Sequence, residues 1–505
     1  MTAAQTNFQS GGGAIDAIVP EESRRDRAAA QRSLTRVGAA IVAIVIAGAA
    51  LRLACAGGPM LIDEMVSLEH VRPLHHFWEV FWGISHDNNH FLTSLWLYWW
   101  DSRTVSAFAL RAPSILIGAA LIPVMAMIAR RSGAAAAIAA AALTAFSYFF
   151  FNYSLEARGY AGLALAFAVA FDATERCIAD PRSRARYVLA AASGLGALAH
   201  LTMLPAIALL ALGAGAALCR RNRAIAPTID AWLRIFVPAA AATLPTLAFL
   251  YLGALNVGSF RIGALLPFGA SLAVNALATG VIDTLGLPAA TPRFIVLVAT
   301  SLVVLGALAS RAVNPDRKFL YAAVIIGIPA MVFIVRPFNV HWPRYFLVAP
   351  LTLILLMADL FGSWWNTGGS RRVVATAALA AMLVGDAALI GRFQSAQSPN
   401  WGDALTTIAA SPNPVVATDF EDRIGLLLRY YNWREGAHVQ SVAERDVCET
   451  TPDWLLTWST LDEVIPDQIV VGEFCPMSFK LAGRYSGWGL SKIPWALYQR
   501  ERPSS

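Results

Sequence analysis

The sequence predicts a polytopic α-helical membrane protein of about eleven transmembrane helices, followed by a small extramembrane α/β domain at the C-terminal end. Hydrophobic residues make up 57% of the 505 residues and charged residues only 14%, whereas soluble domains carry about 25% charged residues. Apolar stretches of about 17–25 residues recur up to residue 391, and each is long enough to cross a bilayer. The net charge of +6 comes from arginines between these stretches. That pattern is typical of topology signals and does not indicate a nucleic-acid partner.

The predicted transmembrane domain covers residues 35–391 and follows a polar, Arg-rich segment, residues 1–34, that we interpret as a disordered cytoplasmic tail. The predicted spans are 37–54, 108–129, 134–152, 157–177, 187–202, 203–219, 232–253, 294–311, 319–335, 345–363 and 373–391. An odd number of spans places the N-terminus inside and the C-terminal domain outside.

The stretch 187–219 decides the direction of every later span. It is too long for one span, and arginines flank it at both ends, within 182–186 and 220–223. Two helices joined by a turn near His200 and Pro205 put both basic ends on the inner side. A single tilted helix would instead move everything downstream to the opposite side.

The distribution of arginine supports the two-helix reading, because Lys and Arg are enriched in cytoplasmic loops. The basic clusters of the predicted inner segments lie in the N-terminal tail and at 130–131, 176–186, 220–223, 311–318 and 371–372. All eight histidines fall outside or at the outer boundary. Histidine does not set topology, so this clustering indicates where the chemistry lies.

The outer segments are unequal in length. The first outer loop, 55–107, contains two aromatic segments, 78–84 and 94–100, that are typical of helices lying in the membrane interface. A second long loop covers 254–292. The last segment, 392–505, alternates strand-like and helix-like stretches, which predicts an α/β domain. Cys448 and Cys475 both lie in this outer domain, where disulfides persist, and we expect them to form a disulfide bond.

Two polar patches lie in the first outer loop. Asp63 and Glu64 follow the first span, and a carboxylate near the bilayer surface can act as a general base. The alternative is a solvated loop acid or a helix cap. His86 and His90 are four residues apart, so a helix would place both on one face, where they could bind a metal ion together with Asp87. The alternative is a solvated, hydrogen-bonding loop.

Two further patches lie in later outer turns. Glu156 and Arg158 occupy a short turn between predicted spans, and an arginine there can bind a phosphate group. The alternative is a local ion pair. The fourth patch comprises Arg336, His341, Arg344 and Tyr345. Arginine on the outer side runs against the usual bias, and its alternative explanation is a side chain that snorkels to the interface.

These patches, in this order, resemble the GT-C superfamily of glycosyltransferases, and most closely its protein O-mannosyltransferase and lipid A aminoarabinose transferase branch. The similar features are an acidic pair at Asp63–Glu64, the stretch NNHFLTSLW, a helix start at Arg111, the motif SLEARGY, His200 in an outer turn and Arg344–Tyr345. The resemblance covers about residues 37–363. NNHF stands where His-Pro-Pro is more usual, so the resemblance assigns neither the acceptor nor the sugar.

The resemblance implies an enzyme of a bacterial inner membrane with a periplasmic C-terminal domain. The donor would be a sugar on a polyprenyl phosphate, held among membrane lipids, and Asp63, with Glu64 beside it, would deprotonate an unknown acceptor. Arg158, Arg344 and Tyr345 would bind the donor phosphate. The residues expected to line the pocket are His86, His90, Glu156, His200 and His341. No cofactor is required by the resemblance, although a divalent metal is compatible with it.

The alternative is a transporter or flippase for a lipid-linked saccharide, which would also be basic and polytopic. Transporters typically bury polar residues near the midplane and contain repeated halves. The sequence shows neither feature, so the enzyme is the favoured interpretation.

Overall fold

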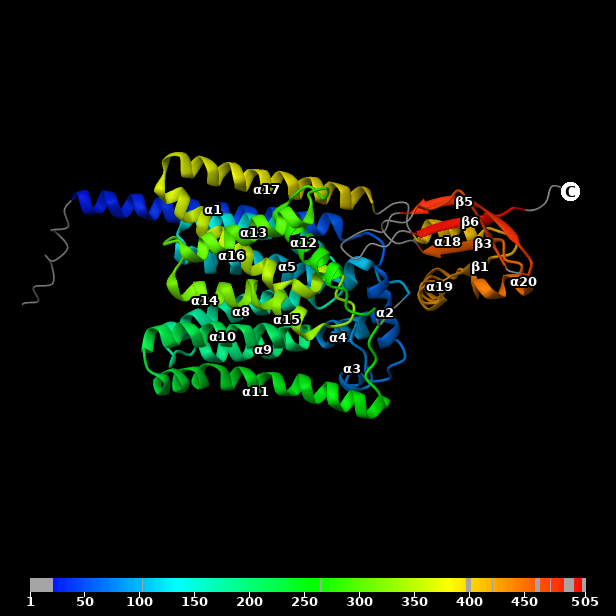
Figure 1. The fold of residues 1–505 in the computed structure, drawn as a ribbon, viewed down its shortest axis with the longest axis horizontal. Helices are drawn as coiled ribbons and strands as arrows, with labels where there is room; N and C mark the ends of the chain where they lie inside the picture. Colours follow the sequence, from blue (N-terminus) through cyan, green and yellow to red (C-terminus); the bar gives the residue numbers. More distant parts are fainter. Residues whose placement is uncertain are drawn as a thin grey trace, which may run out of the picture.

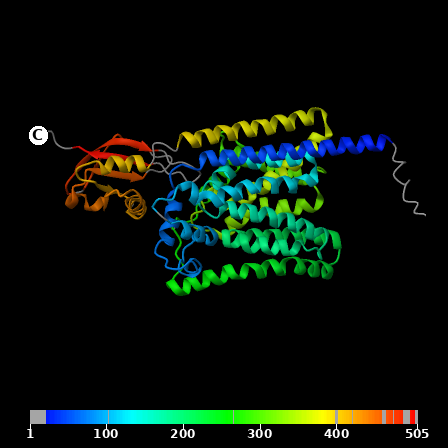
Figure 2. The same cartoon turned by 180° about the vertical axis from the view of Figure 1, so that it is seen from behind.

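The computed structural model describes residues 21–501 apart from 102, 264–265, 397–400, 420, 459–463, 473 and 486–494. Long, roughly parallel helices form a body, and an α/β domain lies at one end of it (Figure 1; seen from behind in Figure 2). The first helix, which begins at Glu21, starts at the opposite end of the body. The predicted fold class, a helical body with a small C-terminal sheet domain, is therefore confirmed.

The helices of the body follow the predicted spans closely. They are α1 (Glu21–Cys55), α5 (Ala107–Ala129), α6 (Ala134–Phe146), α7 (Tyr148–Ser154), α8 (Tyr160–Ala179), α9 (Ala185–Ala199), α10 (Met203–Asn222), α11 (Ile225–Val257), α12 (Ala270–Leu285), α13 (Arg293–Ala309), α14 (Pro315–Ile325), α15 (Gly327–Val335), α16 (Val348–Thr367) and α17 (Gly369–Ser395). The separation of α9 from α10 confirms that 187–219 is two helices.

Among the described residues, seven helical segments are long and apolar enough to cross a membrane, or up to eight if the bent pair α6–α7 is one span. The predicted number of eleven stays a prediction. Helix α16 is central, since 83% of its most apolar window is buried, whereas the corresponding values for α1 and α17 are 11% and 17%. An apolar surface left open on α1 and α17 is what a lipid-facing helix requires.

Two boundaries differ from the sequence predictions. Helix α1 begins at Glu21, so the part of the expected disordered tail that the structure describes is helical. Its Ala- and Arg-rich composition favours helix, while residues 1–20 lie outside the described residues. The predicted loop 254–292 contains α12, whose 16 residues are too few to meet the length expected of a span.

The first outer loop forms three short helices at the end of the body nearest the α/β domain (Figure 1). They are α2 (Ile62–Val71), α3 (Glu79–Trp82) and α4 (Phe91–Trp100). The two aromatic segments expected to be helical overlap α3 and α4. The outward side chain of Trp99 is 64% exposed, which suits an aromatic residue at a membrane interface.

The C-terminal domain contains a six-stranded sheet in the order β2-β1-β3-β6-β5-β4. The strands are β1 (Val415–Thr418), β2 (Gln440–Ala443), β3 (Trp454–Trp458), β4 (Gln468–Val471), β5 (Met477–Tyr485) and β6 (Trp495–Arg500). Strand β1 is parallel to β2 and β3, and the remaining pairs are antiparallel. The strand-like stretches of the sequence form β1, β3 and β6. Strands β2, β4 and β5 were not predicted.

The expected disulfide is present in this domain. Cys448, in the short helix α20 (Val447–Thr450), is bonded to Cys475, with their Cα atoms 5.6 Å apart. Closing a loop with a sequence separation of 27 residues stabilises a domain by roughly 3 kcal/mol. The bond thus reinforces a domain whose strands are mostly short.

Helix α19 (Glu421–Glu435) joins the C-terminal domain to the first outer loop by packing on α2. The Arg429 side chain lies 2.6 Å from Glu69 of α2. The Arg72 guanidinium lies 3.6 Å above the ring of Trp433, a cation–π contact. The domain therefore rests on the helix that also carries Asp63.

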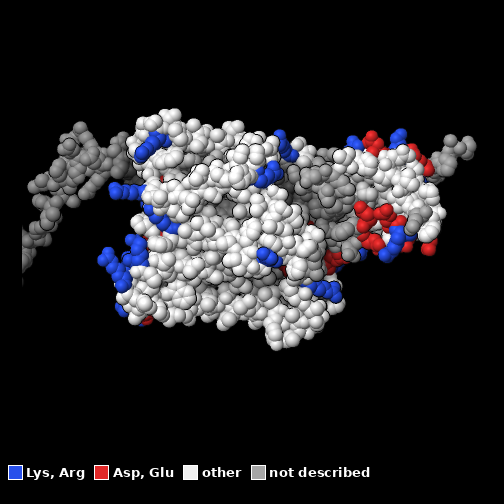
Figure 3. All heavy atoms as spheres, in the orientation of Figure 1, with Lys and Arg blue, Asp and Glu red and all other residues white. Residues whose placement is uncertain are grey.

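Basic side chains gather at the end of the body at which α1 begins, while the C-terminal domain carries many of the acidic ones (Figure 3). Arginine and lysine accumulate on the cytoplasmic side of membrane proteins. This distribution supports the predicted orientation, with the α/β domain outside.

We expect thiol labelling of intact cells to report this orientation. Cys219 is exposed at the basic end, so an impermeant thiol reagent should not reach it. A cysteine in place of Asp467, whose side chain is 88% exposed in the C-terminal domain, should be labelled. Labelling of both sites only after permeabilisation would contradict the orientation, as would labelling of Cys219 in intact cells.

Candidate active site at the outer end of the helical body

Asp63 and two arginines from distant parts of the chain meet at the end of the body beside the C-terminal domain. Asp63 lies in the first turn of α2, Arg158 in the break between α7 and α8, and Arg344 in the 3₁₀ turn η2 (Pro343–Phe346). One carboxylate oxygen of Asp63 accepts hydrogen bonds from both guanidiniums, and Arg344 Nη1 is 3.0 Å away. The expected proximity of these three residues is confirmed.

The three side chains differ in exposure. The Asp63 side chain is 33% exposed, against 15% for Arg344 and 6% for Arg158. The carboxylate is therefore the group of this cluster that an external molecule reaches most easily. The two guanidiniums are fixed behind it, which is the arrangement of a preorganised anion site.

Asn88 links this cluster to the backbone, and the sequence analysis did not single it out. Its Nδ2 donates to the Asp63 carbonyl (3.1 Å) and to Ser67 Oγ (2.9 Å), and its Oδ1 accepts a hydrogen bond from Arg158. The available signal was its place in NNHFLTSLW, two residues before His90, which the sequence did indicate.

His90, His200 and Tyr160 form an aromatic group behind Arg158. The two imidazoles stack with centroids 4.7 Å apart, and the Tyr160 ring lies 5.0 Å from His200. His90 Nε2 is 3.3 Å from Arg158 Nη2. Because arginine can only donate, this nitrogen accepts. Burial lowers the pKa of His200 to about 3 and holds the pKa of His90 well below its usual value, so both rings are neutral at physiological pH.

Gly159 allows this group to assemble. A Cβ atom at this position would lie 1.8 Å from the carbonyl oxygen of Ala199, a distance that no side chain can occupy. The turn that carries Arg158 therefore touches the turn between α9 and α10 that carries His200. The Gly of SLEARGY is explained by this contact.

Glu64 does not share the environment of Asp63. Its carboxylate is fully buried and accepts hydrogen bonds from Arg111 at 2.9 and 2.7 Å, from the Leu61 amide at 2.7 Å and from the Ala157 amide at 2.6 Å. Four donors leave little capacity for a reacting group. The structure thus favours a supporting role for Glu64 over the expected catalytic one.

Glu156 is buried beside the cluster and accepts a 2.9 Å hydrogen bond from Asn152. Burial raises the pKa of Glu156 to about 7, partly opposed by the positive charge of Arg158. This carboxyl group is therefore divided between its neutral and ionised forms near physiological pH.

The helix that would have placed His86 and His90 on one face is not formed, because residues 86–90 contain a turn. His86 turns toward Asp87, with its Nδ1 2.9 Å from Asp87 Oδ1, whereas His90 turns toward Arg158. Asp87 also accepts a hydrogen bond from the Gly263 amide (3.0 Å), which ties the first outer loop to the loop after α11. Within the described ranges, no three His, Cys, Asp or Glu side chains gather in a way that could hold a metal ion.

The fourth patch divides between the site and its surroundings. The His341 ring packs 4.8 Å from Trp342, whose own ring lies 5.2 Å from the Arg344 guanidinium. Tyr345 is half-buried next to Arg344, and burial raises the pKa of its phenol. Arg336 is exposed at the end of α15 and lies 5.9 Å from the Phe268 ring, outside the cluster.

No family model and no curated protein matches the sequence, but solved structures do. The crystal structure of ArnT from Cupriavidus metallidurans in the apo state is 14% identical, covers 92% of this chain and 98% of its own, and superposes with a TM-score of 0.53. The crystal structure of ArnT bound to undecaprenyl phosphate is also 14% identical. It covers 90% of this chain and 97% of its own, and it superposes with a TM-score of 0.51. This chain has the GT-C fold.

The GT-C fold extends over nearly the whole of both chains, so the likeness includes the C-terminal domain as well as the helical body. The oligosaccharyltransferase of Archaeoglobus fulgidus, solved in complex with Zn and sulfate, is also similar, at 14% identity over 83% of this chain and 68% of its own. Its TM-score is 0.44.

The GT-C chain should lose stability when Glu64 is replaced by Gln. The change leaves Arg111 as a buried charge without its anion, and breaking a buried pair costs about 3–5 kcal/mol. Thermal unfolding of the purified protein would measure the loss. Glu69→Gln, on the same helix but in a largely exposed pair with Arg429, is the control and should change stability by no more than about 1 kcal/mol. Equal effects would contradict the supporting role.

Glu156→Gln should change the dependence of stability on pH. The pKa of Glu156 is higher in the folded state than in the unfolded state. Its contribution to stability is therefore fully present below the unfolded-state pKa and is lost as pH rises through about 7. Gln keeps an oxygen acceptor for Asn152 but does not titrate. The melting temperature of the variant relative to that of the wild type should therefore rise between pH 4.5 and 8. A difference in melting temperature that stays constant with pH would contradict the assignment.

Proposed function

We propose that the protein is an inverting glycosyltransferase that moves a sugar from a polyprenyl-phosphate donor to an acceptor at the outer membrane face. The observation that carries this proposal is the Asp63 carboxylate held between Arg158 and Arg344. The GT-C fold and the binding of undecaprenyl phosphate by ArnT support the donor class. The disulfide in the C-terminal domain supports an oxidising, periplasmic location.

The reaction is a single displacement. Asp63 removes a proton from the acceptor nucleophile, which attacks the anomeric carbon from the face opposite the phosphate. The bond between that carbon and the phosphate oxygen breaks, and polyprenyl phosphate leaves with the electron pair. Arg158 and Arg344 stabilise its negative charge.

The resting contacts add a second element to this mechanism. Asp63 occupies the two guanidiniums in the structure, and a donor phosphate would compete for the same hydrogen bonds, which arginine forms well with phosphate. Donor binding would thus release the carboxylate toward the acceptor. His90, neutral and in contact with Arg158, would keep that guanidinium oriented without adding charge.

Asp63→Asn should abolish sugar transfer while leaving donor binding largely intact. General-base catalysis contributes about 10²–10⁴-fold, so the rate of transfer should fall at least about 100-fold. Incubation of purified protein with candidate polyprenyl-phosphate sugars, followed by detection of released polyprenyl phosphate, would measure it. Glu69→Gln is again the matched control.

Activity of Asp63→Asn within about tenfold of the wild type would remove Asp63 from the proposed chemistry. The transporter alternative predicts a different result in the same assay. Intact lipid-linked saccharide would cross the bilayer of a reconstituted vesicle, and no polyprenyl phosphate would be released by the wild type.

A further inference from the structure

A polar cavity lies at the opposite, basic end of the body from the candidate active site. Its volume is about 480 Å³, and it is bordered by the 3₁₀ turn η1 (Arg130–Ser132) that follows α5, the connection between α13 and α14, and the last turns of α16. The side chains around it include Arg131, Ser132, Arg311, Asn314, Asp359 and Asn366. None of them belongs to the candidate active site, because they lie at the end at which α1 begins.

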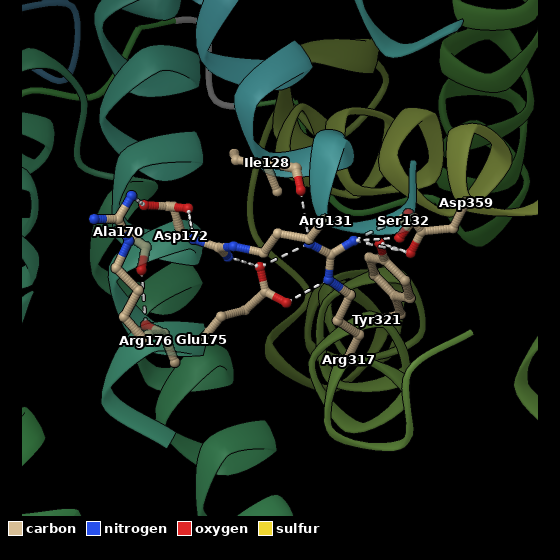
Figure 4. A network of polar contacts seen from close by, with 11 residues as sticks. Ile128, Arg131, Ser132, Ala170, Asp172, Glu175, Arg176, Arg317, Tyr321 and Asp359 are labelled. Atoms are coloured by element: carbon tan, nitrogen blue, oxygen red, sulfur yellow. Dashed lines mark hydrogen bonds and ion pairs between the residues drawn. The ribbon is translucent and has the colours of Figure 1, made fainter. Parts of the chain in front are cut away.

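One wall of the cavity is an ion-pair network, shown in Figure 4. Arg317 of α14 is nearly buried and lies between Asp359 of α16, at 3.0 Å, and Glu175 of α8. The Tyr321 hydroxyl donates to Asp359 at 2.8 Å. Arg131 extends the network from Glu175, at 2.5 Å, to Asp172. The network thus joins α5, α8, α14 and α16.

The charges within this network balance. It contains three carboxylates, at Asp172, Glu175 and Asp359, and three guanidiniums, at Arg131, Arg176 and Arg317. Asp359 therefore borders the cavity without making it acidic.

Arg311 adds a positive charge beyond that balance. Its side chain is exposed and has no hydrogen bond or ion pair with any residue in the described part of the chain. Arg131 is also partly exposed, at 36% of its side chain. The neutral amides and hydroxyls of Asn314, Asn366 and Ser132 supply further hydrogen-bonding groups around the same space.

We propose that this cavity binds a phosphate group presented at the inner membrane surface, with Arg311 as its main cation. Arginine suits phosphate because its planar guanidinium donates two parallel hydrogen bonds. Basic pockets between helices on the cytoplasmic side suit the head groups of anionic lipids. The same chemistry would accept free inorganic phosphate, so the test separates the two sources. The site is independent of the sugar transfer proposed at the outer end.

Binding can be tested on the purified full-length protein by native mass spectrometry and by thermal shift. The probes are phosphatidylglycerol, phosphatidylcholine and inorganic phosphate, each added alone to delipidated protein. We expect the wild type to prefer phosphatidylglycerol to phosphatidylcholine. Arg311→Glu should weaken that binding by at least about tenfold, since it replaces a charge-assisted contact with repulsion.

Two variants separate this site from general attraction to a basic surface. Arg182→Glu makes the same change of charge at an exposed arginine in the connection between α8 and α9, which does not line the cavity, and should leave the affinity within about twofold, because interactions between separated, solvent-exposed charges are screened. Ser363→Phe fills the cavity without changing charge and should reduce binding as Arg311→Glu does.

The outcomes are distinct. A response to inorganic phosphate that Arg311→Glu removes supports the cavity and identifies a free anion as its occupant. A response to phosphatidylglycerol alone identifies a lipid. Equal losses in Arg182→Glu and Arg311→Glu would overturn the proposal, as would a wild type that binds neither phosphate source.

Discussion

The buried ion pair of Glu64 and Arg111 is the contact on which the outer site depends. Arg111 of α5 donates to the carbonyls of Ala56, Gly58 and Pro59 and to Glu64, and so fixes the path of the chain from α1 into α2. Glu64 also accepts the amide hydrogen of Ala157.

Two of the three residues of the candidate site are direct chain neighbours of the residues joined by that hydrogen bond. Asp63 precedes Glu64, and Arg158 follows Ala157. The hydrogen bond from the Ala157 amide to the Glu64 carboxylate holds the two backbone segments together. Asp63 and Arg158, the adjacent residues on each segment, are thereby brought close enough for their side chains to pair. The fully buried Glu64 side chain therefore determines how the side chains of Asp63 and Arg158 are placed relative to each other.

The two ends of the body use charge in different ways. At the outer end, the single carboxylate of Asp63 pairs with two guanidiniums. These three groups carry a net positive charge, which a phosphate would neutralise. At the inner end, the charges around Arg317 cancel, which makes the network a connection between helices. Charged groups are costly within a membrane protein, so a cluster whose charges do not balance is a candidate binding site, whereas a balanced one can serve to connect helices.

Much of this arrangement could be predicted from the sequence. The lengths of apolar stretches identified most helices, and the ordered motifs brought Asp63, Arg158, His200 and Arg344 to one face. Helix α12 was missed because it is too short to span, and the short strands β2 and β4 because four residues carry little periodicity.

Side-chain contacts were the other limit of the sequence. Nothing in it distinguishes Asp63 from its neighbour Glu64, since the difference arises from burial against Arg111. His86 and His90 looked like a pair only under the assumption of a helix that the chain does not form there. The role of Asn88 likewise depends on a turn that local sequence does not specify.

The packing of α19 on α2 has a consequence for how the protein can be divided. Met65, Leu68 and Val71 of α2 lie in one apolar cluster with Ile424 and Leu427 of α19. Each such side chain loses about 1.5–3 kcal/mol of burial energy when it is returned to water. A shortened chain ending after α17 would therefore keep every residue of the outer site. The ten-residue helix α2, which carries Asp63, would nevertheless lose the apolar surface of α19 against which it packs. The C-terminal domain is a structural support for the membrane part, and removing it would leave the site incomplete in geometry though complete in composition.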